Sequence, residues 1–231
     1  AAQGIGAAIA VALHGAGAQV VAHDRDGDRL RELQSQAPGL AIEVADLALL
    51  EEVARLGTNV SGDGAVDILV LCASVQRRRP WAEALVEEAG AELAVNFEAS
   101  RALLGRLAPA MVKRGWGRIL AIGSVQELAP RPDMLVYAAL KAAQTNLVMG
   151  LAKELAPHGV TCNVLAPGVI ETSRNTNALQ DGTYRQQVLS MIPAGRIGAP
   201  QDCTGTALLL CSEAGAYITG QRFVVDGGMT A

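Results

Sequence analysis

Short runs of apolar, often β-branched residues alternate along the chain with longer stretches whose apolar residues recur at helical spacing. Residues 67–71 are almost entirely apolar, which is typical of a strand covered on both faces. The pattern predicts strands at residues 20–23, 40–44, 67–71, 118–122, 160–165 and 222–225. It predicts helices at residues 7–14, 29–36, 47–56, 81–95, 97–113, 135–156 and 200–212. Residues 171–192 are polar and show neither period, so we expect an irregular lid there.

A chain that alternates strands with helices in this way forms a parallel sheet with right-handed crossovers and helices on both faces. The expected fold class is therefore α/β, with a doubly wound parallel sheet. No repeat, low-complexity run or linker divides the chain. Because its length suits one domain of ordinary size, we expect residues 1–231 to form a single domain.

Composition and charge narrow the classes of protein to which this chain can belong. Half of the residues are hydrophobic and 18% are charged, which excludes an intrinsically disordered chain. The 19 Lys and Arg residues against 23 Asp and Glu give a formal net charge of −4, which argues against nucleic acid or an anionic membrane surface as the main partner. No apolar run is long enough to span a membrane, and no secretion signal is visible.

The cysteines and histidines show no pattern of a disulfide framework or of a metal site. The four cysteines are scattered and form no Cys-x-x-Cys pair, which favours reduced thiols in a cytoplasmic protein. The three histidines form no i, i+4 pair and lie beside no carboxylates at ligand spacing, so no metal is expected.

A pair of glycines marks one candidate binding site. Gly4 and Gly6 open the helix predicted at residues 7–14, and N–H groups at a helix start beside glycines suit a pyrophosphate. The next predicted strand ends at Asp24, 18 residues after Gly6. A carboxylate there can accept hydrogen bonds from both ribose hydroxyls of an adenosine and repels a 2′-phosphate, which favours NAD over NADP. Arg25 offers the alternative of holding a 2′-phosphate, and a simple polar turn would also have this sequence.

A tyrosine and a lysine mark a second candidate site. Tyr137 and Lys141 are at i, i+4 on the helix predicted at residues 135–156, so they share one face. The unperturbed pKa of a phenol is about 10, and we expect an ammonium one turn away to lower it. Ser124 follows the strand predicted at residues 118–122, and its hydroxyl could bind the oxygen atom that Tyr137 protonates. A surface i, i+4 pair is the alternative for the Tyr-x-x-x-Lys motif taken alone.

Together these motifs make the chain resemble the short-chain dehydrogenase/reductase family, of the Tyr-x-x-x-Lys type, along its whole length. Residues 4–6 match the second half of the family motif Thr-Gly-x-x-x-Gly-x-Gly. Residues 167–172 match its Pro-Gly-x-x-x-Thr segment, and residues 196–200 and 219–228 match its C-terminal signature. The resemblance implies a Rossmann-like dinucleotide-binding and catalytic domain. It also implies a homo-oligomer, most often a homotetramer, that interconverts a secondary alcohol and a ketone with a nicotinamide cofactor and a small-molecule substrate.

The resemblance also implies roles for individual residues. Tyr137 exchanges a proton with the substrate oxygen, Lys141 lowers the pKa of the tyrosine and holds the nicotinamide ribose, and Ser124 orients the carbonyl group. Asn96 anchors a water that relays protons to Lys141. The implied catalytic residues are Asn96, Ser124, Tyr137 and Lys141. The implied cofactor-binding residues are Gln3, Gly4, Ile5, Gly6, Asp24, Arg25, Asp46, Leu47, Cys72, Ala73, Ser74, Tyr137, Lys141, Pro167, Gly168, Ile170 and Thr172.

The chain departs from the family pattern in two places. Where the family has Asn-Asn-Ala-Gly, this chain has Leu71-Cys72-Ala73-Ser74. Ala73 keeps a small residue beside the cofactor, so we interpret this change as tolerated variation. The family's first strand and its Thr-Gly do not precede Ala1 in the sequence, so the doubly wound sheet is expected to lack this strand. We expect the parent protein to supply a strand that ends in Thr-Gly before Ala1.

The substrate is less constrained than the reaction. The run Arg77-Arg78-Arg79 follows the strand predicted at residues 67–71, on the side of the sheet where ligands bind. A solvated loop is the simpler interpretation, and attraction of an anionic substrate, such as a sugar acid or a carrier thioester, is the alternative. Gln126, Glu127 and Arg174 favour a hydroxylated substrate, so a polyol, a sugar acid or a hydroxyacyl compound is expected. The rival function is a dinucleotide-binding sensor or scaffold without turnover, which only the two departures support.

Overall fold

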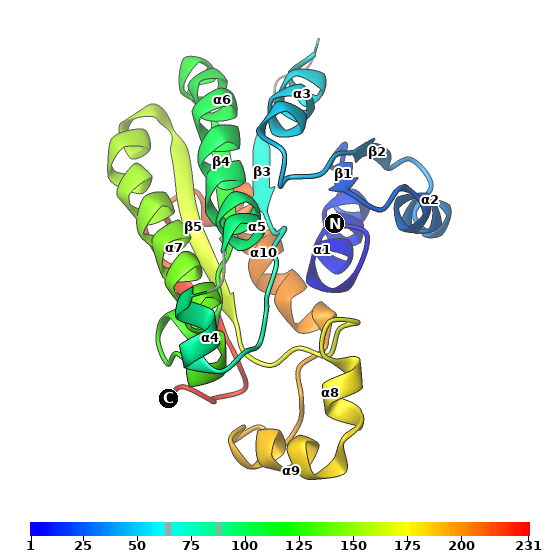
Figure 1. Cartoon of the computed structure of the whole chain (residues 1–231). Coiled ribbons are helices and arrows are strands. Elements are labelled where there is room, and N and C mark those ends of the chain that lie inside the picture. The colour runs from blue at the N-terminus through cyan, green and yellow to red at the C-terminus, as the bar shows by residue number, and fades with distance from the viewer. Residues whose placement is uncertain (63–65, 87–88) are drawn as a thin grey trace.

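The computed structural model describes residues 1–62, 66–86 and 89–231 (Figure 1). Its strands are β1 (Val21–Asp24), β2 (Ala41–Val44), β3 (Ile68–Leu71), β4 (Gly117–Ile122), β5 (Val160–Pro167) and β6 (Arg222–Val225). Its α-helices are α1 (Gly4–Gly15), α2 (Gly27–Gln36), α3 (Leu50–Ser61), α4 (Trp81–Val86), α5 (Gly90–Leu93), α6 (Ala99–Arg114), α7 (Leu135–Leu155), α8 (Thr176–Gln180), α9 (Gly182–Ser190) and α10 (Thr204–Leu210). A π-helix (Ala94–Glu98) joins α5 to α6, and short 3-10 turns lie at Val125–Glu127, Pro132–Met134, Ala156–His158, Pro200–Cys203 and Glu213–Gly215.

All strand pairs are parallel, and they form two hydrogen-bonded groups. β1 pairs with β2, and the other strands follow the order β3-β4-β5-β6. β4 and β5 are buried along their whole length, which explains why their sequences are almost continuously apolar. Each predicted strand lies within two residues of an observed one. The predicted α/β fold with a parallel sheet is therefore confirmed.

β1 and β3 do not pair with each other, and no strand of the described ranges lies between them. Side chains connect the two groups of strands instead. Ile9 and Leu13 of α1 are buried, and Val20 before β1 and Ile68 of β3 pack against the same core cluster. The strand that we expect to precede Ala1 is outside this sequence and stays a prediction about the parent protein.

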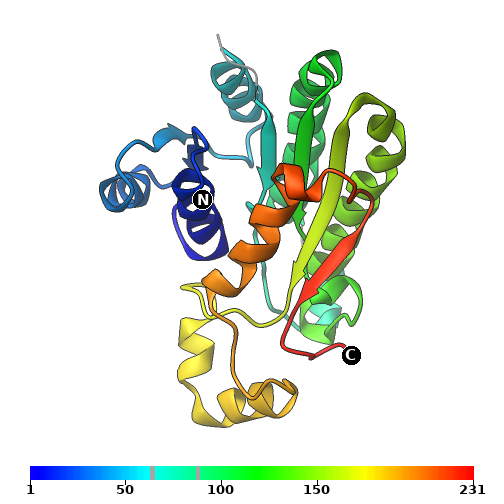
Figure 2. The same ribbon diagram turned by 180° about the vertical axis from the view of Figure 1, so that it is seen from behind.

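Helices cover the four-stranded sheet on both faces (Figures 1 and 2). α3, α6 and α7 lie on one face, where Leu104, Met111 and Val148 belong to the larger hydrophobic core. α1 and α10 lie on the other face, where Ile9 and Leu165 belong to a second core. The two cores hold the strands rigidly between them, so the segments that follow the carboxyl ends of the strands have a fixed base.

The expectation that residues 171–192 are irregular is wrong, because this segment contains α8 and α9. Its expected role as a lid stays a prediction. The carboxylate of Asp181 caps α9 by accepting hydrogen bonds from two backbone N–H groups of its first turn, at 2.9 and 3.2 Å. Leu179, Val188 and Ile192 are buried together in a small cluster. A local cap and a few apolar contacts therefore order a segment whose overall composition is polar.

Helix ends also differ from the prediction. The helix predicted at residues 47–56 begins at Leu50, because the Asp46 side chain holds a turn by accepting a hydrogen bond from the N–H of Ala48 at 2.9 Å. The helix predicted at residues 81–95 divides into α4, α5 and the start of the π-helix, and residues 87–88 lie outside the described part of the chain.

Gly159, between α7 and β5, has φ of +71°, and a Cβ there would lie 2.2 Å from the carbonyl oxygen of Gly115. We expect Gly159→Ala to lower the free energy of unfolding by at least about 2 kcal/mol, because the left-handed conformation and the backbone clash both add cost. Gly150→Ala on the exposed side of α7 is the control, since nothing lies within 4 Å of the added Cβ. It should raise stability by about 0.5–1 kcal/mol. Urea unfolding followed by circular dichroism measures both, and unchanged stability of Gly159→Ala would contradict the expected clash with Gly115.

Candidate active site

A cavity of about 560 Å³ lies at the carboxyl ends of β1, β3, β4 and β5. The segments that follow these strands form its walls, together with the start of α1 and one face of α7. Three of the implied catalytic residues line it, namely Ser124, Tyr137 and Lys141. So do all the implied cofactor-binding residues, which are Gln3, Gly4, Ile5, Gly6, Asp24, Arg25, Asp46, Leu47, Cys72, Ala73, Ser74, Tyr137, Lys141, Pro167, Gly168, Ile170 and Thr172.

The start of α1 forms the part of the cavity that suits a pyrophosphate. No side chain of the described residues caps this helix, so N–H groups of its first turn remain available. Gly4 has φ of +57°, and a Cβ on it would lie 3.0 Å from the methyl carbon of Thr172. A Cβ on Gly6 would lie 3.3 Å from Cys72 Sγ. Side chains at these positions would fill the space beside the N–H groups, so the residues present fit a dinucleotide.

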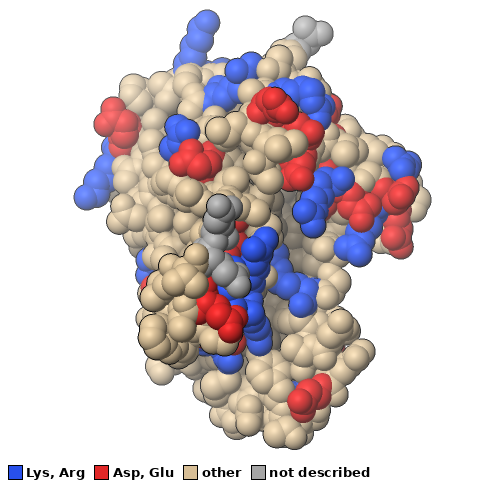
Figure 3. Space-filling view, in the orientation of Figure 1, with Lys and Arg blue, Asp and Glu red and all other residues tan. Residues whose placement is uncertain are grey.

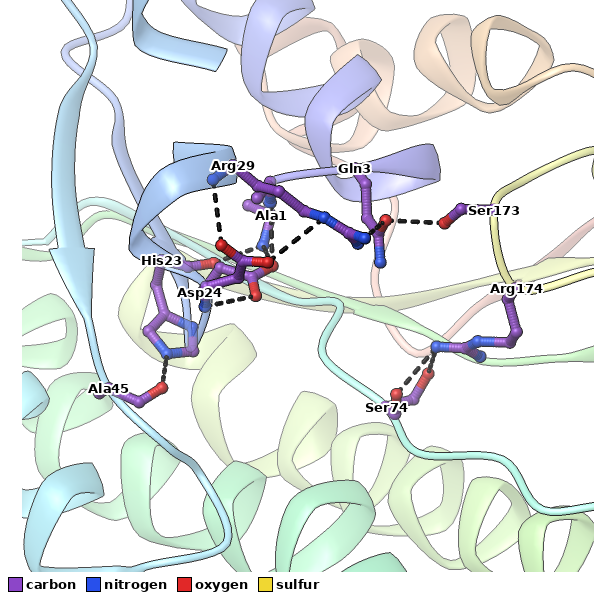
Figure 4. A network of polar contacts seen from close by, with 11 residues as sticks. Ala1, Gln3, His23, Asp24, Arg29, Ala45, Ser74, Ser173 and Arg174 are labelled. Atoms are coloured by element: carbon purple, nitrogen blue, oxygen red, sulfur yellow. Dashed lines mark hydrogen bonds and ion pairs between the residues drawn. The ribbon is translucent and has the colours of Figure 1, made fainter. Parts of the chain in front are cut away.

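Asp24 and Arg25 line the cavity beyond the end of β1. The Asp24 carboxylate accepts hydrogen bonds from the N–H groups of Ala2 and Asp26, at 3.0 and 3.2 Å, which fix its orientation. Beside it, His23 Nε2 donates to a backbone carbonyl oxygen at 2.9 Å, and burial lowers the pKa of His23 (Figure 4). The carboxylate of Asp24 and the guanidinium of Arg25 therefore place opposed charges side by side at this end of the cavity.

Ser124 follows β4, and Tyr137 and Lys141 lie one turn apart on α7, all three buried. The Lys141 Nζ atom lies 6.0 Å from the centroid of the Tyr137 ring. The sequence predicts a lowered pKa for this phenol. In the structure burial raises the pKa of Tyr137, and the charge of Arg174 and the hydroxyl of Ser124 act against burial. The predicted direction is wrong because removal from water outweighs the neighbouring groups.

The Lys141 ammonium is held by two hydrogen bonds inside the protein. It donates to the carbonyl oxygen of Ile122 at 2.7 Å and to Oε1 of Gln144 at 3.1 Å. The amide of Gln144 in turn donates to the hydroxyl of Ser100 at 2.7 Å. Burial lowers the pKa of Lys141 to about 8. Gln144 is absent from the sequence-based site, although its place three residues after Lys141 puts it on the same helix face.

Asn96 lies behind the cavity and does not line it. It is fully buried in the π-helix, and both ends of its amide pair with the backbone of Val75. The N–H of Val75 donates to Oδ1 and Nδ2 donates to the carbonyl oxygen, each at 2.7 Å. Asn96 therefore fixes the segment after β3, and its implied role in anchoring a water stays a prediction.

The three further polar residues expected near the site divide between the cavity and the core. Gln126 and Arg174 line the cavity, whereas Glu127 does not. Glu127 forms an ion pair with Arg222 at 3.1 Å, and burial raises its pKa. Arg174 Nη2 donates to the carbonyl oxygen of Ser74 at 2.8 Å and to its hydroxyl at 2.9 Å, which joins the segments after β3 and β5 (Figure 4).

Known proteins are similar to this chain in sequence and in fold. A family model described as enoyl-(acyl carrier protein) reductase matches residues 1–230. Gluconate 5-dehydrogenase of Gluconobacter oxydans (strain 621H) is 34% identical over 238 residues, covering 100% of this chain and 92% of that protein. The 3-oxoacyl-[acyl-carrier-protein] reductase FabG of Escherichia coli (strain K12) is 37% identical over 233 residues, covering 99% and 94%. The crystal structure of a 3-oxoacyl (acyl-carrier-protein) reductase from Agrobacterium tumefaciens C58 with NADP bound has a TM-score of 0.93 and 35% identity, covering 98% of this chain and 90% of that one.

The chain belongs to the short-chain dehydrogenase/reductase family. It is an NAD(P)-dependent oxidoreductase that acts on CH–OH groups. Within the described ranges, no helix combines the length and apolar character needed to cross a membrane.

We expect the stability of the protein, measured against a Lys141→Met variant, to rise with pH. The pKa of Lys141 is about 8 in the folded protein and 10.5 for an ordinary lysine in water. Between these values the unfolded chain binds more protons, so a higher pH favours folding. The cost of burying the ammonium is fully present below pH 8. From pH 7 to 9.5 the wild type should gain about 2 kcal/mol over the variant. Urea unfolding across this pH range measures the free energy of unfolding of both proteins. If the two proteins showed the same change of stability with pH, the expected effect of Lys141 would be contradicted.

Proposed function

We propose that Tyr137 is the general acid and base of the reaction, assisted by Ser124 and Lys141. The observation that carries this proposal is their convergence on one wall of a cavity whose other end suits a dinucleotide. A phenol, a hydroxyl and an ammonium together can bind and protonate one oxygen atom of an alcohol or ketone. Asn96 supports this wall from behind through its two hydrogen bonds to Val75.

Oxidation of a secondary alcohol removes a hydride from carbon and a proton from the hydroxyl group. The nicotinamide cofactor, when bound, accepts the hydride or supplies it in the reverse direction. Tyr137 as phenolate takes the hydroxyl proton, while the Ser124 hydroxyl donates a hydrogen bond to the same oxygen. Because burial raises the pKa of Tyr137, the phenolate depends on nearby positive charge. Arg174 supplies it, and the Lys141 ammonium lies 6.0 Å from the centroid of the Tyr137 ring.

Lys141 has a second part in this scheme. Its pKa of about 8 allows it to lose and regain a proton near physiological pH. The hydrogen bonds to Ile122 and Gln144 keep the ammonium one turn from the phenol while this happens. Lys141 can therefore both stabilise the phenolate and pass its proton onward.

We propose NAD as the preferred cofactor. Support comes from Asp24, whose oriented carboxylate lines the cavity where an adenosine ribose would lie and repels a 2′-phosphate. Two observations favour NADP instead, namely the exposed Arg25 in the same wall and the NADP bound to the Agrobacterium tumefaciens reductase. Hydrogen bonds from the N–H groups of Ala2 and Asp26 hold the Asp24 carboxylate in place, whereas the Arg25 side chain is exposed.

We further propose that the protein is a cytoplasmic homotetramer acting on a small molecule. Its four cysteines are free thiols, which fits a reducing compartment. The apolar side chains of Leu209 and Val224 are exposed in the C-terminal part of the chain, which fits an interface between copies through β6 and its neighbours.

Replacing Tyr137 by Phe tests the catalytic assignment. Turnover of NADH-linked alcohol or ketone substrates should fall about 10²- to 10⁴-fold, the usual contribution of a general acid and base. The affinity for NADH, measured by fluorescence titration, should change only slightly. Tyr217→Phe is the matched control because Tyr217 is fully exposed. Normal turnover by Tyr137→Phe would refute the assignment, and a wild type that binds NADH but turns over no alcohol or ketone would favour the sensor or scaffold.

A second experiment compares NADH and NADPH binding in the wild type, Asp24→Asn and Asp28→Asn. The wild type should bind NADH at least about 10-fold more tightly, because a carboxylate and a 2′-phosphate repel each other. Asp24→Asn should remove most of this difference. Asp28 is exposed at the start of α2 and does not line the cavity, so its variant should behave like the wild type. Tighter binding of NADPH by the wild type would reverse the cofactor assignment in favour of Arg25.

A further inference from the structure

The arginine run after β3 is not a uniformly solvated loop. Arg79 is buried and forms an ion pair with the buried carboxylate of Glu92. Arg77 is exposed and does not line the cavity. Arg78 lines the cavity, donates from Nη1 to the hydroxyl of Tyr184 at 2.9 Å and lies 5.4 Å from the centroid of its ring. The buried pair at Arg79 therefore anchors the segment that presents Arg78 to the cavity.

Arg174 comes to the same cavity from a different segment, the one that follows β5. Its guanidinium donates hydrogen bonds to Ser74 (Figure 4). Its charge also acts on the phenol of Tyr137. Arg174 therefore lies at the reactive end. Two arginines that are far apart in sequence, Arg78 and Arg174, therefore line one cavity.

Both guanidinium groups keep donors for a ligand. A guanidinium has five N–H donors, and the hydrogen bonds described above use only Nη2 of Arg174 and Nη1 of Arg78, on neutral partners. Asp133, whose charge also reaches Arg78, is itself paired with Arg131 at 3.0 Å and does not line the cavity. Neither arginine has a carboxylate within ion-pair distance among the described residues.

The reactive end of the cavity is positive, although the whole chain has a net charge of −4. Lys141, Arg78 and Arg174 line the cavity, and the charge of Arg174 acts on Tyr137. Within the described part of the chain, the carboxylates that line the cavity are Asp24 and Asp46, which follow β1 and β2 at the adenosine end. Figure 3 shows basic side chains gathered along the hollow of this face, between the α4 and α8 sides of the molecule. Such a concave positive surface attracts and orients an anion.

We propose that the substrate carries a carboxylate, which Arg174 and Arg78 bind while the reacting oxygen lies beside Tyr137. The substrate class is then a hydroxy acid in the oxidative direction and an oxo acid in the reductive one. This inference rests on the proposed function of Tyr137. A planar guanidinium matches a carboxylate with two parallel hydrogen bonds, whereas a polyol or a neutral thioester would leave both charges without an anionic partner.

Kinetics with matched acidic and neutral substrates test this proposal. The probes in oxidation are gluconate against glucitol and lactate against lactamide. In reduction, acetoacetate is compared with its N-acetylcysteamine thioester. For the wild type, kcat/KM should be at least about 100-fold higher for an acid than for its neutral counterpart. Arg174→Gln and Arg78→Gln should each lower this ratio about 10-fold, because a charge-assisted hydrogen bond to the carboxylate is lost. For Arg78→Gln the change should lie mainly in KM, whereas Arg174→Gln should also lower kcat for acid and neutral substrates alike, since its charge acts on Tyr137. Arg77→Gln is the matched control and should keep the wild-type ratio.

The outcomes separate this inference from the proposed function. If the wild type uses glucitol or the thioester as well as an acid, and Tyr137→Phe abolishes that activity, the carboxylate site is overturned and the proposed function stands. If Arg174→Gln bound NADH more weakly but kept the wild-type ratio of kcat/KM between acid and neutral substrates, Arg174 would be assigned to the cofactor. This result would also overturn the proposal. If no probe turns over, gluconate and lactate are titrated into the NADH complex and followed by NADH fluorescence. Binding that requires Arg78 and Arg174 supports the site, and no binding overturns it.

Discussion

The burial of the Lys141 ammonium is the constraint on which the arrangement of the site depends. A charge removed from water needs acceptors fixed in place, and here they come from Ile122 on β4 and Gln144 on α7. α7 must therefore stay docked on the sheet, and the buried Val148 further along the helix belongs to the core that keeps it there. Apolar packing offsets the free-energy cost of the buried charge. Because α7 is held on the sheet in this way, the position of Tyr137, one turn before Lys141, is fixed as well.

The cavity joins two ends of different charge. Asp24 and Asp46 lie at one end and Arg174 at the other, and the start of α1 lies along the same cavity. The carboxylates can accept hydrogen bonds from the hydroxyls of an adenosine ribose, and the N–H groups at the start of α1 suit a pyrophosphate. Hydrogen bonding therefore suits this part of the cavity to the adenosine half of a dinucleotide, and the backbone of α1 contributes to it without any charged side chain.

The sequence was sufficient to predict the strands, because burial on both faces makes β4 and β5 continuously apolar. It was also sufficient to predict that Ser124, Tyr137 and Lys141 share one site, because the spacing of their motif is specific. It was insufficient where a local contact decides the outcome. The helices within residues 171–192 depend on the cap supplied by Asp181, which a period cannot show. The different positions of three adjacent arginines depend on a carboxylate at Glu92, on another element. The direction of the Tyr137 pKa depends on depth of burial, which spacing does not give.

The catalytic residues are buried, whereas the residues proposed to bind the substrate carboxylate lie on exposed segments. Ser124, Tyr137 and Lys141 are buried residues of the β4–α7 unit, so a change there also disturbs packing. Arg78 and Arg174 project from exposed segments after β3 and β5, where substitution costs little stability. Over evolutionary time the reaction type is thus held by the same forces that hold the fold, while the choice of substrate is free to diverge through a few surface replacements.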